Sequence, residues 1–303
     1  MMSKNIVVPL TVPEKFRDIF CQNYAKATEN TGRLLLFAGD QKVEHLNKDF
    51  YGNGIDPEDA DPRHLFEIAS KARIGAFATN LGLIARYAHD YRNVRYVVKL
   101  NGKTDLVPSS NAEPLSRCWY SVSQVADFKT QSGLDIVGVG ITVYLGSEYE
   151  SQMLAAAAQA IYDAHQNGLL AIVWMYPRGR AVTDERHPDI IAGAAGVAAC
   201  LGADFVKLNV PDASDGSKSA ELLCQATLAA GTTKIICSGG SRKTTDVYVQ
   251  DLYHQIHVGG AQGAAIGRNI HQRSLPEALK LCKAVSALIF DGVDAAAAQK
   301  LLK

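Results

Sequence analysis

Short apolar runs recur along most of the chain, and each is followed by glycine or polar residues. Most of these runs are continuously apolar rather than alternating, and they occupy residues 34–39, 76–79, 96–100, 136–143, 170–175, 205–208, 234–237 and 263–266. Continuous apolar runs of about four to eight residues are typical of parallel strands that are covered on both faces. The pattern therefore predicts eight buried strands.

The segments between these runs are long enough to hold crossover helices. Residues 151–167 and 189–201 are rich in alanine, and each segment is followed by a glycine, which commonly ends a helix. Eight strand-helix units in about 240 residues have the size of an α/β protein of the (β/α)8 TIM-barrel class. A doubly wound open sheet is the alternative that this pattern leaves open.

Helix-start signals occur near both ends of the chain. Thr11-Val-Pro-Glu14 has the spacing of a capping box and predicts a helix over residues 13–28, and Ser274-Leu-Pro-Glu277 has the same spacing before an apolar helix. The alanine-rich residues 294–303 predict one more short helix. Because the sequence has no Ser/Gly linker, low-complexity tract or fixed-period repeat, we expect residues 1–303 to form one barrel domain with an extra N-terminal helix and C-terminal helices.

Charge and composition narrow the class of partner. Lys and Arg number 31, Asp and Glu number 31, and no basic run occurs. Nucleic acid and anionic membranes are therefore not indicated, and a small molecule is the expected partner. No apolar run reaches the roughly 18 residues of a membrane span, and the N-terminal residues do not form a secretory signal. We expect a cytoplasmic protein.

If the barrel forms, its active site lies at the carboxyl ends of the strands. Asp40 follows the first strand, Lys99 lies in the third, Trp174 and Tyr176 end the fifth, and Lys207 lies in the sixth. Residues two apart in an extended strand face the same side, so the two aromatic rings would face one space. A carboxylate, a phenol and two amines are thus expected to meet there.

Lys207 is the strongest candidate for a catalytic nucleophile among these residues. It lies between two apolar residues in "FVKLNV", where an ammonium group is costly to desolvate. An ordinary lysine with a pKa of about 10.4 is almost wholly charged at pH 7, whereas burial can lower a lysine pKa to about 6 and leave a neutral amine. Such an amine attacks a ketone or aldehyde to form a Schiff base. Two alternatives stay open: Lys207 could pair with an internal carboxylate, and Lys99 could be the nucleophile or supply a positive field.

Tyr176 and Asp40 also have structural alternatives. Tyr176 could be a core aromatic whose hydroxyl binds a backbone group, but its neighbours Trp174 and Lys207 favour a role in proton transfer. Asp40 could cap the turn that follows it, or it could orient substrate hydroxyls from the end of the first strand.

Two glycine-containing segments follow the last two apolar runs. They are "CSGGSRK" (237–243) and "AIGRNI" (265–270), and the second contains Arg268. Glycine lets backbone N–H groups approach phosphate oxygens, and a helix start adds partial positive charge. Together the two segments predict a phosphate site.

Motifs for other chemistries are absent from the sequence. It contains no H-E-x-x-H, P-loop or G-x-S-x-G pattern, and "GVGITVYLG" lacks the third glycine of a dinucleotide-binding loop. Only the pair Glu44-His45, close to Asp40 in the sequence, keeps a metal-binding site as an alternative. The six cysteines are scattered without a C-x-x-C pair, so we expect reduced packing residues.

In chain order, the motifs "AGDQKVEH", "VYLGSE", "VWMYPRG", "FVKLNV", "SGG" and "IGRN" resemble those of the archaeal-type class I fructose-1,6-bisphosphate aldolases. This is a Schiff-base branch of the TIM-barrel aldolases that also contains deoxyribose-phosphate aldolase and the ADTH synthases. The similarity covers roughly residues 34–270. The W-x-Y pair favours an aldolase over the ADTH synthases.

The resemblance implies roles for particular residues. Lys207 would be the Schiff-base lysine, Tyr176 the acid/base tyrosine and Asp40 the first-strand carboxylate. The substrate would be bound by the pocket tryptophan, an arginine at the mouth and the phosphate loops, which correspond to Trp174, Arg178, Ser238, Gly239, Gly240, Gly267 and Arg268.

The implied reaction is the reversible cleavage of fructose 1,6-bisphosphate through a covalent imine, with no metal or other cofactor, in a homo-oligomer. The polar segment from Lys42 to His64 departs from the family pattern, so the substrate range is the open point. The alternatives are a Schiff-base aldolase or transaldolase acting on another phosphorylated sugar, as the ADTH synthases do, and a non-catalytic sugar-phosphate-binding barrel.

Overall fold

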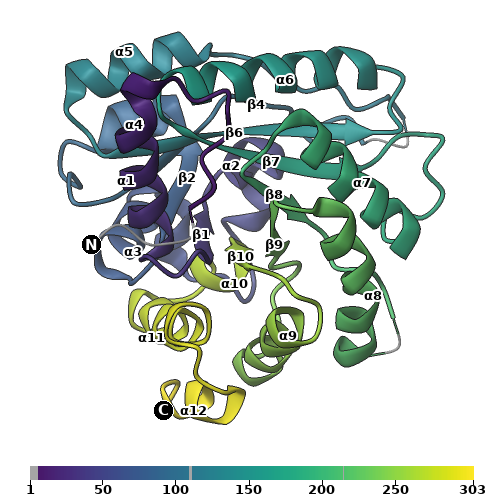
Figure 1. Cartoon of the computed structure of the whole chain (residues 1–303). Coiled ribbons are helices and arrows are strands. Elements are labelled where there is room, and N and C mark those ends of the chain that lie inside the picture. Colours follow the sequence, from purple (N-terminus) through teal and green to yellow (C-terminus); the bar gives the residue numbers. More distant parts are fainter. Residues whose placement is uncertain (1–5, 109–110, 214) are drawn as a thin grey trace.

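The computed structural model describes residues 6–108, 111–213 and 215–303. Within these ranges, eight parallel strands close into a barrel in the order β1, β10, β9, β8, β7, β6, β3 and β2 (Figure 1). The barrel strands are β1 (Leu34–Ala38), β2 (Ala76–Asn80), β3 (Tyr96–Lys99), β6 (Ile136–Leu145), β7 (Leu170–Pro177), β8 (Phe205–Leu208), β9 (Lys234–Ser238) and β10 (Gly263–Ile266). All eight predicted strands are confirmed, and barrel closure excludes the doubly wound open sheet.

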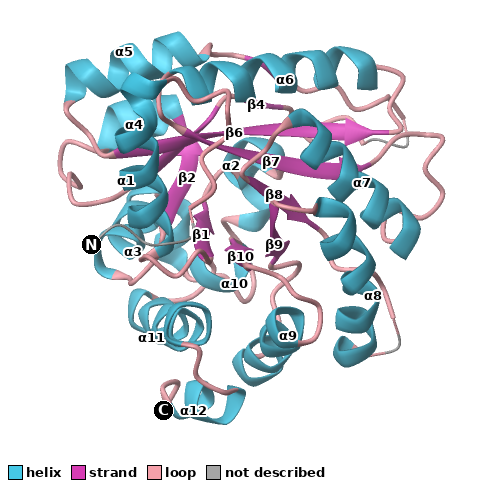
Figure 2. Ribbon diagram, viewed as in Figure 1, coloured by secondary structure: helices cyan, strands magenta, loops and turns pink. Residues whose placement is uncertain are grey.

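Helices surround the barrel and cover the outer face of its strands (Figure 2). Those that follow successive barrel strands are α3 (Pro62–Lys71), α4 (Leu81–Tyr87), α5 (Val122–Ser132), α6 (Glu150–Gln166), α7 (Pro188–Leu201), α8 (Gly216–Ala230), α9 (Thr245–His257) and α11 (Leu275–Ser286). The (β/α)8 architecture is therefore confirmed. No helix in the described part of the chain is long and apolar enough to cross a membrane.

Further elements extend this plan. A short 3-10 turn, η1 (Glu14–Phe16), leads into α1 (Arg17–Thr28), and a π-helical turn, η4 (Ala287–Asp291), precedes α12 (Ala295–Lys300), so the predicted terminal helices are present. The segments after β1 and β10 hold the short elements α2 (Gln41–Glu44), η2 (Leu46–Asp49), η3 (Pro57–Ala60) and α10 (Arg268–His271). The antiparallel pair β4 (Asn101–Gly102) and β5 (Arg117–Cys118) was not predicted, because strands of two residues carry no periodicity.

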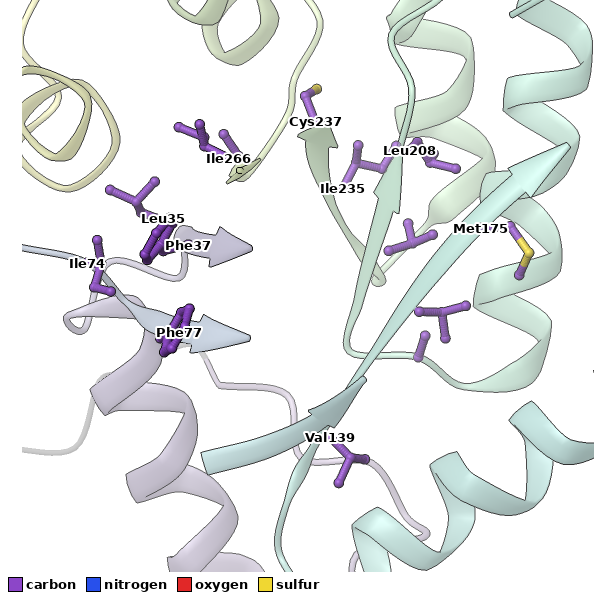
Figure 3. Packing of buried hydrophobic residues seen from close by; sticks show 14 of the residues in the cluster. Leu35, Phe37, Ile74, Phe77, Val139, Met175, Leu208, Ile235, Cys237 and Ile266 are labelled. Atoms are coloured by element: carbon purple, nitrogen blue, oxygen red, sulfur yellow. The ribbon is translucent and has the colours of Figure 1, made fainter. Parts of the chain in front are cut away.

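Successive side chains of a strand point to opposite faces of the barrel wall, so the apolar residues form two separate cores. Phe37, Val139 and Met175 belong to the core between strands and helices, which Figure 3 shows at close range. Leu36 and the other strand residues whose side chains point inward fill the barrel interior, and Phe20 of α1 packs against them. Helix α1 therefore covers the amino-terminal end of the barrel, and the carboxyl end remains for a site.

The first predicted capping box is wrong. The hydroxyl of Thr11 is hydrogen-bonded to Nδ1 of His165 at 2.6 Å, and η1 begins without a side-chain cap. His165 is buried and its Nε2 lies 3.3 Å from Asp204, so Thr11 satisfies a buried imidazole instead of a helix end. The second box is confirmed, because the Glu277 carboxylate accepts the backbone N–H of Ser274 at 3.3 Å.

All six cysteines are described and none forms a disulfide. Cys237 and Cys282 are buried, and burial raises the pKa of each thiol to about 12. Cys118, Cys200 and Cys224 are exposed, so their prediction as packing residues is wrong. Apolar sequence neighbours misled the prediction, because adjacent residues of a helix face different sides.

Candidate active site

A cavity of about 350 Å³ opens at the carboxyl ends of the barrel strands. All ten residues predicted for the site line it, at or after the ends of β1, β7, β8, β9 and β10. They are Asp40, Trp174, Tyr176, Arg178, Lys207, Ser238, Gly239, Gly240, Gly267 and Arg268. Their location was thus predictable from the sequence, and their chemical roles stay predictions.

The strand alternation directs Trp174 and Lys207 into the barrel. The two residues are direct neighbours across β7 and β8, and the ring of Trp174 is buried in the interior core. The Nζ atoms of Lys99 and Lys207 lie 5.0 and 5.4 Å from the centre of this ring. The indole therefore forms an apolar wall beside both amines.

Gly140 of β6 leaves the space that the indole occupies. A Cβ atom at this position would lie 2.4 Å from one ring carbon of Trp174 and 3.4 Å from Cδ of Lys99. This glycine belongs to the segment that superficially resembles a dinucleotide loop. In the structure, its missing side chain makes room for the Trp174 ring.

Replacing Gly140 with alanine is expected to displace Trp174 and lower kcat/KM for the reaction that the motifs predict by on the order of 10²-fold, because misplacement by about 1 Å costs that much in an active site. Steady-state cleavage assays and near-ultraviolet circular dichroism of the tryptophans would measure it. The matched control is Gly193→Ala in α7, where a Cβ meets no atom within 4 Å and activity should be unchanged. Full activity of Gly140→Ala would contradict the packing argument.

Lys99 is a fixed positive charge. Its Nζ donates to Oγ1 of Thr142 at 2.7 Å and lies 3.3 Å from Oδ2 of Asp40 and 3.6 Å from Oε1 of Glu44. The side chain is only 1% exposed. These contacts hold the amine of Lys99 between two carboxylates and a hydroxyl, so the structure favours Lys99 as the source of a positive field rather than as the nucleophile.

Lys207, unlike Lys99, is not held by any carboxylate of the described residues. It is buried, and in the described ranges it has neither a hydrogen bond nor an ion pair. Burial lowers the pKa of Lys207 below its ordinary value, and the charges of Asp40 and Glu44 oppose this only in part. The alternative of an internally paired lysine is therefore not found, and Lys207 is the amine suited to nucleophilic attack.

Tyr176 presents its ring to the same cavity. Its hydroxyl has no hydrogen-bond partner among the described residues, so the alternative of a backbone partner is not found. Burial raises the pKa of Tyr176 well above its usual value, and the charges of Glu44 and Asp40 raise it further. The resting phenol is therefore protonated and able to donate.

Asp40 is an ionised carboxylate at the inner end of the cavity. It precedes α2, but its side chain makes no capping hydrogen bond, so the capping alternative is wrong. Burial alone raises the pKa of this carboxyl, yet the charges of Lys99 and Lys207 outweigh burial and hold the pKa below its usual value.

The two glycine loops lie side by side across the cavity, after β9 and β10. Gly240 has a φ of 65°, and a Cβ on Gly267 would lie 2.2 Å from Nε2 of Gln41, so both positions require glycine. Ser238 donates to Oδ1 of Asn209 at 2.7 Å. Backbone N–H groups and Arg268 can therefore converge on an anion, as a phosphate site requires.

The long segment after β1 packs onto α10. The Asp59 carboxylate lies 2.7 Å from Nδ1 of His271 with both side chains fully buried, and Gln272 donates to the carbonyl of Asp49 at 2.9 Å. Oδ2 of Asp49 also lies 3.7 Å from Nε of Arg268. The segment that departs from the family pattern thus contacts Arg268, the arginine predicted for the phosphate site.

Sequence reasoning missed about half of the cavity lining. The residues it did not assign to the site are Gln41, Lys48, Asp105, Glu185, Arg186, Asn209 and Ala265, together with Glu44 and His45, which it considered only for a metal. Glu44 carried a usable signal, because four residues after Asp40 it shares a helical face with it. Glu185, which pairs with Arg178 at 3.0 and 3.1 Å, lies in a loop without such a signal.

A parallel eight-stranded barrel with a buried, unpaired lysine facing a polar cavity is the arrangement expected of a TIM-barrel enzyme that works through a Schiff base. Comparison with known proteins agrees, because the profile of the DeoC/LacD family aldolases matches residues 34–273. The chain belongs to this family of aldolases, which confirms the resemblance in its motifs.

Individual relatives match nearly the whole chain. A Methanocaldococcus jannaschii protein named fructose-bisphosphate aldolase/6-deoxy-5-ketofructose 1-phosphate synthase is 50% identical over 292 residues, which are 96% of this chain and 93% of that protein. The structure of a fructose-bisphosphate aldolase from Slackia heliotrinireducens is 51% identical with a TM-score of 0.96, covering 100% of this chain and 95% of its own. An archaeal fructose-1,6-bisphosphate aldolase with its catalytic lysine bound to the carbinolamine intermediate is 30% identical with a TM-score of 0.76, covering 90% and 99%.

Proposed function

We propose that this protein is a class I aldolase that reversibly cleaves fructose 1,6-bisphosphate into dihydroxyacetone phosphate and glyceraldehyde 3-phosphate. The observation that carries the proposal is the contrast between two lysines of one barrel. Lys99 is held by Asp40 and Glu44, whereas Lys207 is buried without a partner and has a lowered pKa. The motifs and the names of the relatives support the same reaction.

In the proposed mechanism, the amine of Lys207 adds to the C2 ketone, and loss of water gives a protonated imine. The imine accepts electrons as the C3–C4 bond breaks, while Tyr176 takes the proton of the C4 hydroxyl. Tyr176 then protonates C3 of the enamine, and hydrolysis releases dihydroxyacetone phosphate. Asp40 assists the proton transfers of the carbinolamine. Because the imine is the electron sink, we propose that no metal or other cofactor takes part.

The phosphate loops would orient the substrate. Ser238, Gly239, Gly240, Gly267 and Arg268 would hold the C1 phosphate and so place the C2 ketone against the sixth barrel strand. Holding the reacting atoms together in this way is a large part of the rate enhancement of most enzymes.

A second candidate activity is suggested by the double name of the relative that is 50% identical. In 6-deoxy-5-ketofructose 1-phosphate, carbons 4 to 6 carry a hydroxyl, a ketone and a methyl group. An aldol reaction would form them from methylglyoxal, with carbons 1 to 3 supplied by the enamine of dihydroxyacetone phosphate. The same lysine and the same phosphate site would serve both reactions.

Lys48 is expected to distinguish these two reactions. Lys48 lines the cavity and is exposed to solvent. The three arginines of the lining, in contrast, each pair with a carboxylate: Arg178 with Glu185, Arg186 with Asp212 and Arg268 with Asp49. Lys48→Gln should lower kcat/KM for fructose 1,6-bisphosphate about 10-fold through the second phosphate, the loss of one charged contact. It should leave the methylglyoxal reaction unchanged.

Parallel assays of both reactions would measure this effect. Lys218→Gln, an exposed lysine outside the cavity lining, is the matched control. An equal loss in both reactions, or no loss in either, would contradict a contact between Lys48 and the second phosphate.

Two experiments test the proposed function. Incubation with fructose 1,6-bisphosphate should release both triose phosphates, and borohydride reduction in the presence of dihydroxyacetone phosphate should leave an adduct on the peptide that contains Lys207. A non-catalytic sugar-phosphate-binding barrel would give neither product nor adduct. An enzyme for another phosphorylated sugar would give the adduct but leave the bisphosphate uncleaved.

We also propose that the chain works as one domain and in the cytoplasm, as its sequence patterns led us to expect, and as a homo-oligomer, as its family resemblance implies. Sedimentation equilibrium of the purified protein would test the oligomer, and a monomer at micromolar concentration would contradict it.

A further inference from the structure

Glu44 lies four residues after Asp40, across the single turn of α2, so the two carboxylates face the same side. Their nearest oxygens lie 3.3 Å (Asp40) and 3.6 Å (Glu44) from Nζ of Lys99. The remaining contacts of this ammonium are neutral oxygens, those of Thr142 and the Asn101 carbonyl. Two negative charges therefore share one fixed positive charge.

The other charged groups of the lining do not balance the second carboxylate. Within the described ranges, the remaining acidic groups in or next to the cavity lining have basic partners of their own: Glu185 has Arg178, Asp105 has Lys103, Asp212 has Arg186, and Asp49 has Arg268. Lys48 is exposed to solvent, which screens its charge. Asp40 and Glu44 thus share Lys99 as their one ion-pair partner among the described residues at the inner end of the cavity.

Glu44 also has an unsatisfied oxygen. Its Oε1 is buried and accepts no hydrogen bond from any described residue, because the Lys99 ammonium 3.6 Å away is an ion-pair partner beyond hydrogen-bond distance. The side chain lines the cavity and is 14% exposed. A buried carboxylate oxygen without a donor is costly, and such groups in native structures call for an explanation. The explanation we favour is a positive charge that is present only during the reaction.

We propose that Glu44 is a further catalytic residue, whose carboxylate balances the positive charge that forms on Lys207 during catalysis. The inference rests on the proposed Schiff-base function. One amine, one ketone and one proton give one protonated imine and one water: the N–C2 bond forms, the C2–O bond breaks, and the oxygen leaves as water. The nitrogen of the attacking neutral amine thus carries a positive charge once the imine is protonated. Stabilising a charge that develops only along the reaction path accelerates the reaction.

The charge of Glu44 acts on both reacting side chains. Burial lowers the pKa of Lys207, Asp40 and Glu44 raise it, and Arg268 lowers it. Burial raises the pKa of Tyr176, Glu44 and Asp40 raise it further, and Lys99 and Arg178 lower it. Removal of this one carboxylate charge should therefore alter the proton affinities of the amine and the phenol together.

The test compares Glu44→Gln and Glu44→Asp with the wild-type protein. Glu44→Gln should lower kcat about 10- to 100-fold with little change in KM, because the lost interaction belongs to charged intermediates. Both limbs of its kcat/KM profile should move to lower pH, since Lys207 and Tyr176 in the free enzyme each lose a proton more readily without the anion. Glu44→Asp should recover much of the rate and the original profile. Glu221→Gln, an exposed carboxylate on α8, is the matched control and should behave as wild type.

Borohydride trapping with dihydroxyacetone phosphate separates this inference from the substrate assignment. If wild type is trapped but does not cleave fructose 1,6-bisphosphate, the proposed substrate fails, and a reduced trapped fraction in Glu44→Gln at equal pH still supports the role of Glu44. Wild-type kcat and trapping in Glu44→Gln would overturn the proposal. Equal losses in both Glu44 variants with unmoved pH profiles would overturn it as well, because a merely structural role predicts that result.

Discussion

Replacing Lys207 with methionine is expected to abolish aldol cleavage, lowering kcat/KM by on the order of 10⁴-fold or more, as the loss of a covalent nucleophile does in other enzymes. Methionine nearly matches the lysine stem in volume, so the apolar contacts inside the barrel are kept. Among the described residues, the buried amine has no hydrogen-bond or ion-pair partner that the substitution would remove. Coupled assays of triose phosphate release would measure the effect.

The same variant should be at least as stable as wild type. A lysine whose pKa falls on folding destabilises the folded state at every pH below its unfolded pKa of about 10.4, because the unfolded chain binds the proton more tightly. Methionine removes this cost, so the midpoint of thermal unfolding at pH 7 should be equal or higher. Lys300→Met, an exposed lysine on α12, should change neither activity nor midpoint. Retained cleavage by Lys207→Met would refute the assignment and direct attention to Lys99.

Replacing Tyr176 with phenylalanine is expected to lower the rate of carbon–carbon bond cleavage by about 10² to 10⁴-fold, the usual contribution of a positioned acid or base. In the synthetic direction the protonated phenol donates to the aldehyde oxygen. In the cleavage direction it must first lose its proton, and the positive charge of the neighbouring imine favours this loss. The ring and its contact with the Arg178 guanidinium, 5.7 Å from the ring centre, are kept in the variant.

Imine formation should survive in Tyr176→Phe, because the phenol is assigned to the C3–C4 step and not to attack by the amine. Borohydride trapping of dihydroxyacetone phosphate should therefore stay within a few-fold of wild type while cleavage falls. Tyr162→Phe, on the outer surface of α6, provides the matched control. Loss of trapping together with cleavage would mean that Tyr176 acts earlier in the reaction than we propose.

The barrel and the position of its site were predictable because both follow from local sequence patterns. Continuous apolar runs gave every barrel strand, and a spacing of two placed Trp174 and Tyr176 on the cavity side. The glycine-containing segments after the last two apolar runs indicated where a phosphate site was expected, and the structure shows that a Cβ at Gly267 would lie too close to Gln41. These signals depend on the backbone, which obeys the same rules in every chain.

Pairings between distant side chains could not be predicted in this way. Nothing local in "VVKLNG" indicates that Lys99 meets Asp40 and Glu44, and this contact is what separates the two candidate lysines. Thr11 fails for the same reason, since its partner His165 is 154 positions away. Such contacts depend on how the barrel closes, and a single sequence carries no periodic trace of them.

The buried contact between Asp59 and His271 ties the assembly of the catalytic chamber to the order in which the chain folds. The partners are 212 positions apart, and the neighbouring bond from Gln272 to Asp49 spans 223. Encounters over such separations are entropically expensive until the intervening strands are in place. A growing polypeptide therefore already contains Lys207 before Arg268 can contact Asp49. The lining of the cavity is complete only when the first and last strands of the barrel have met.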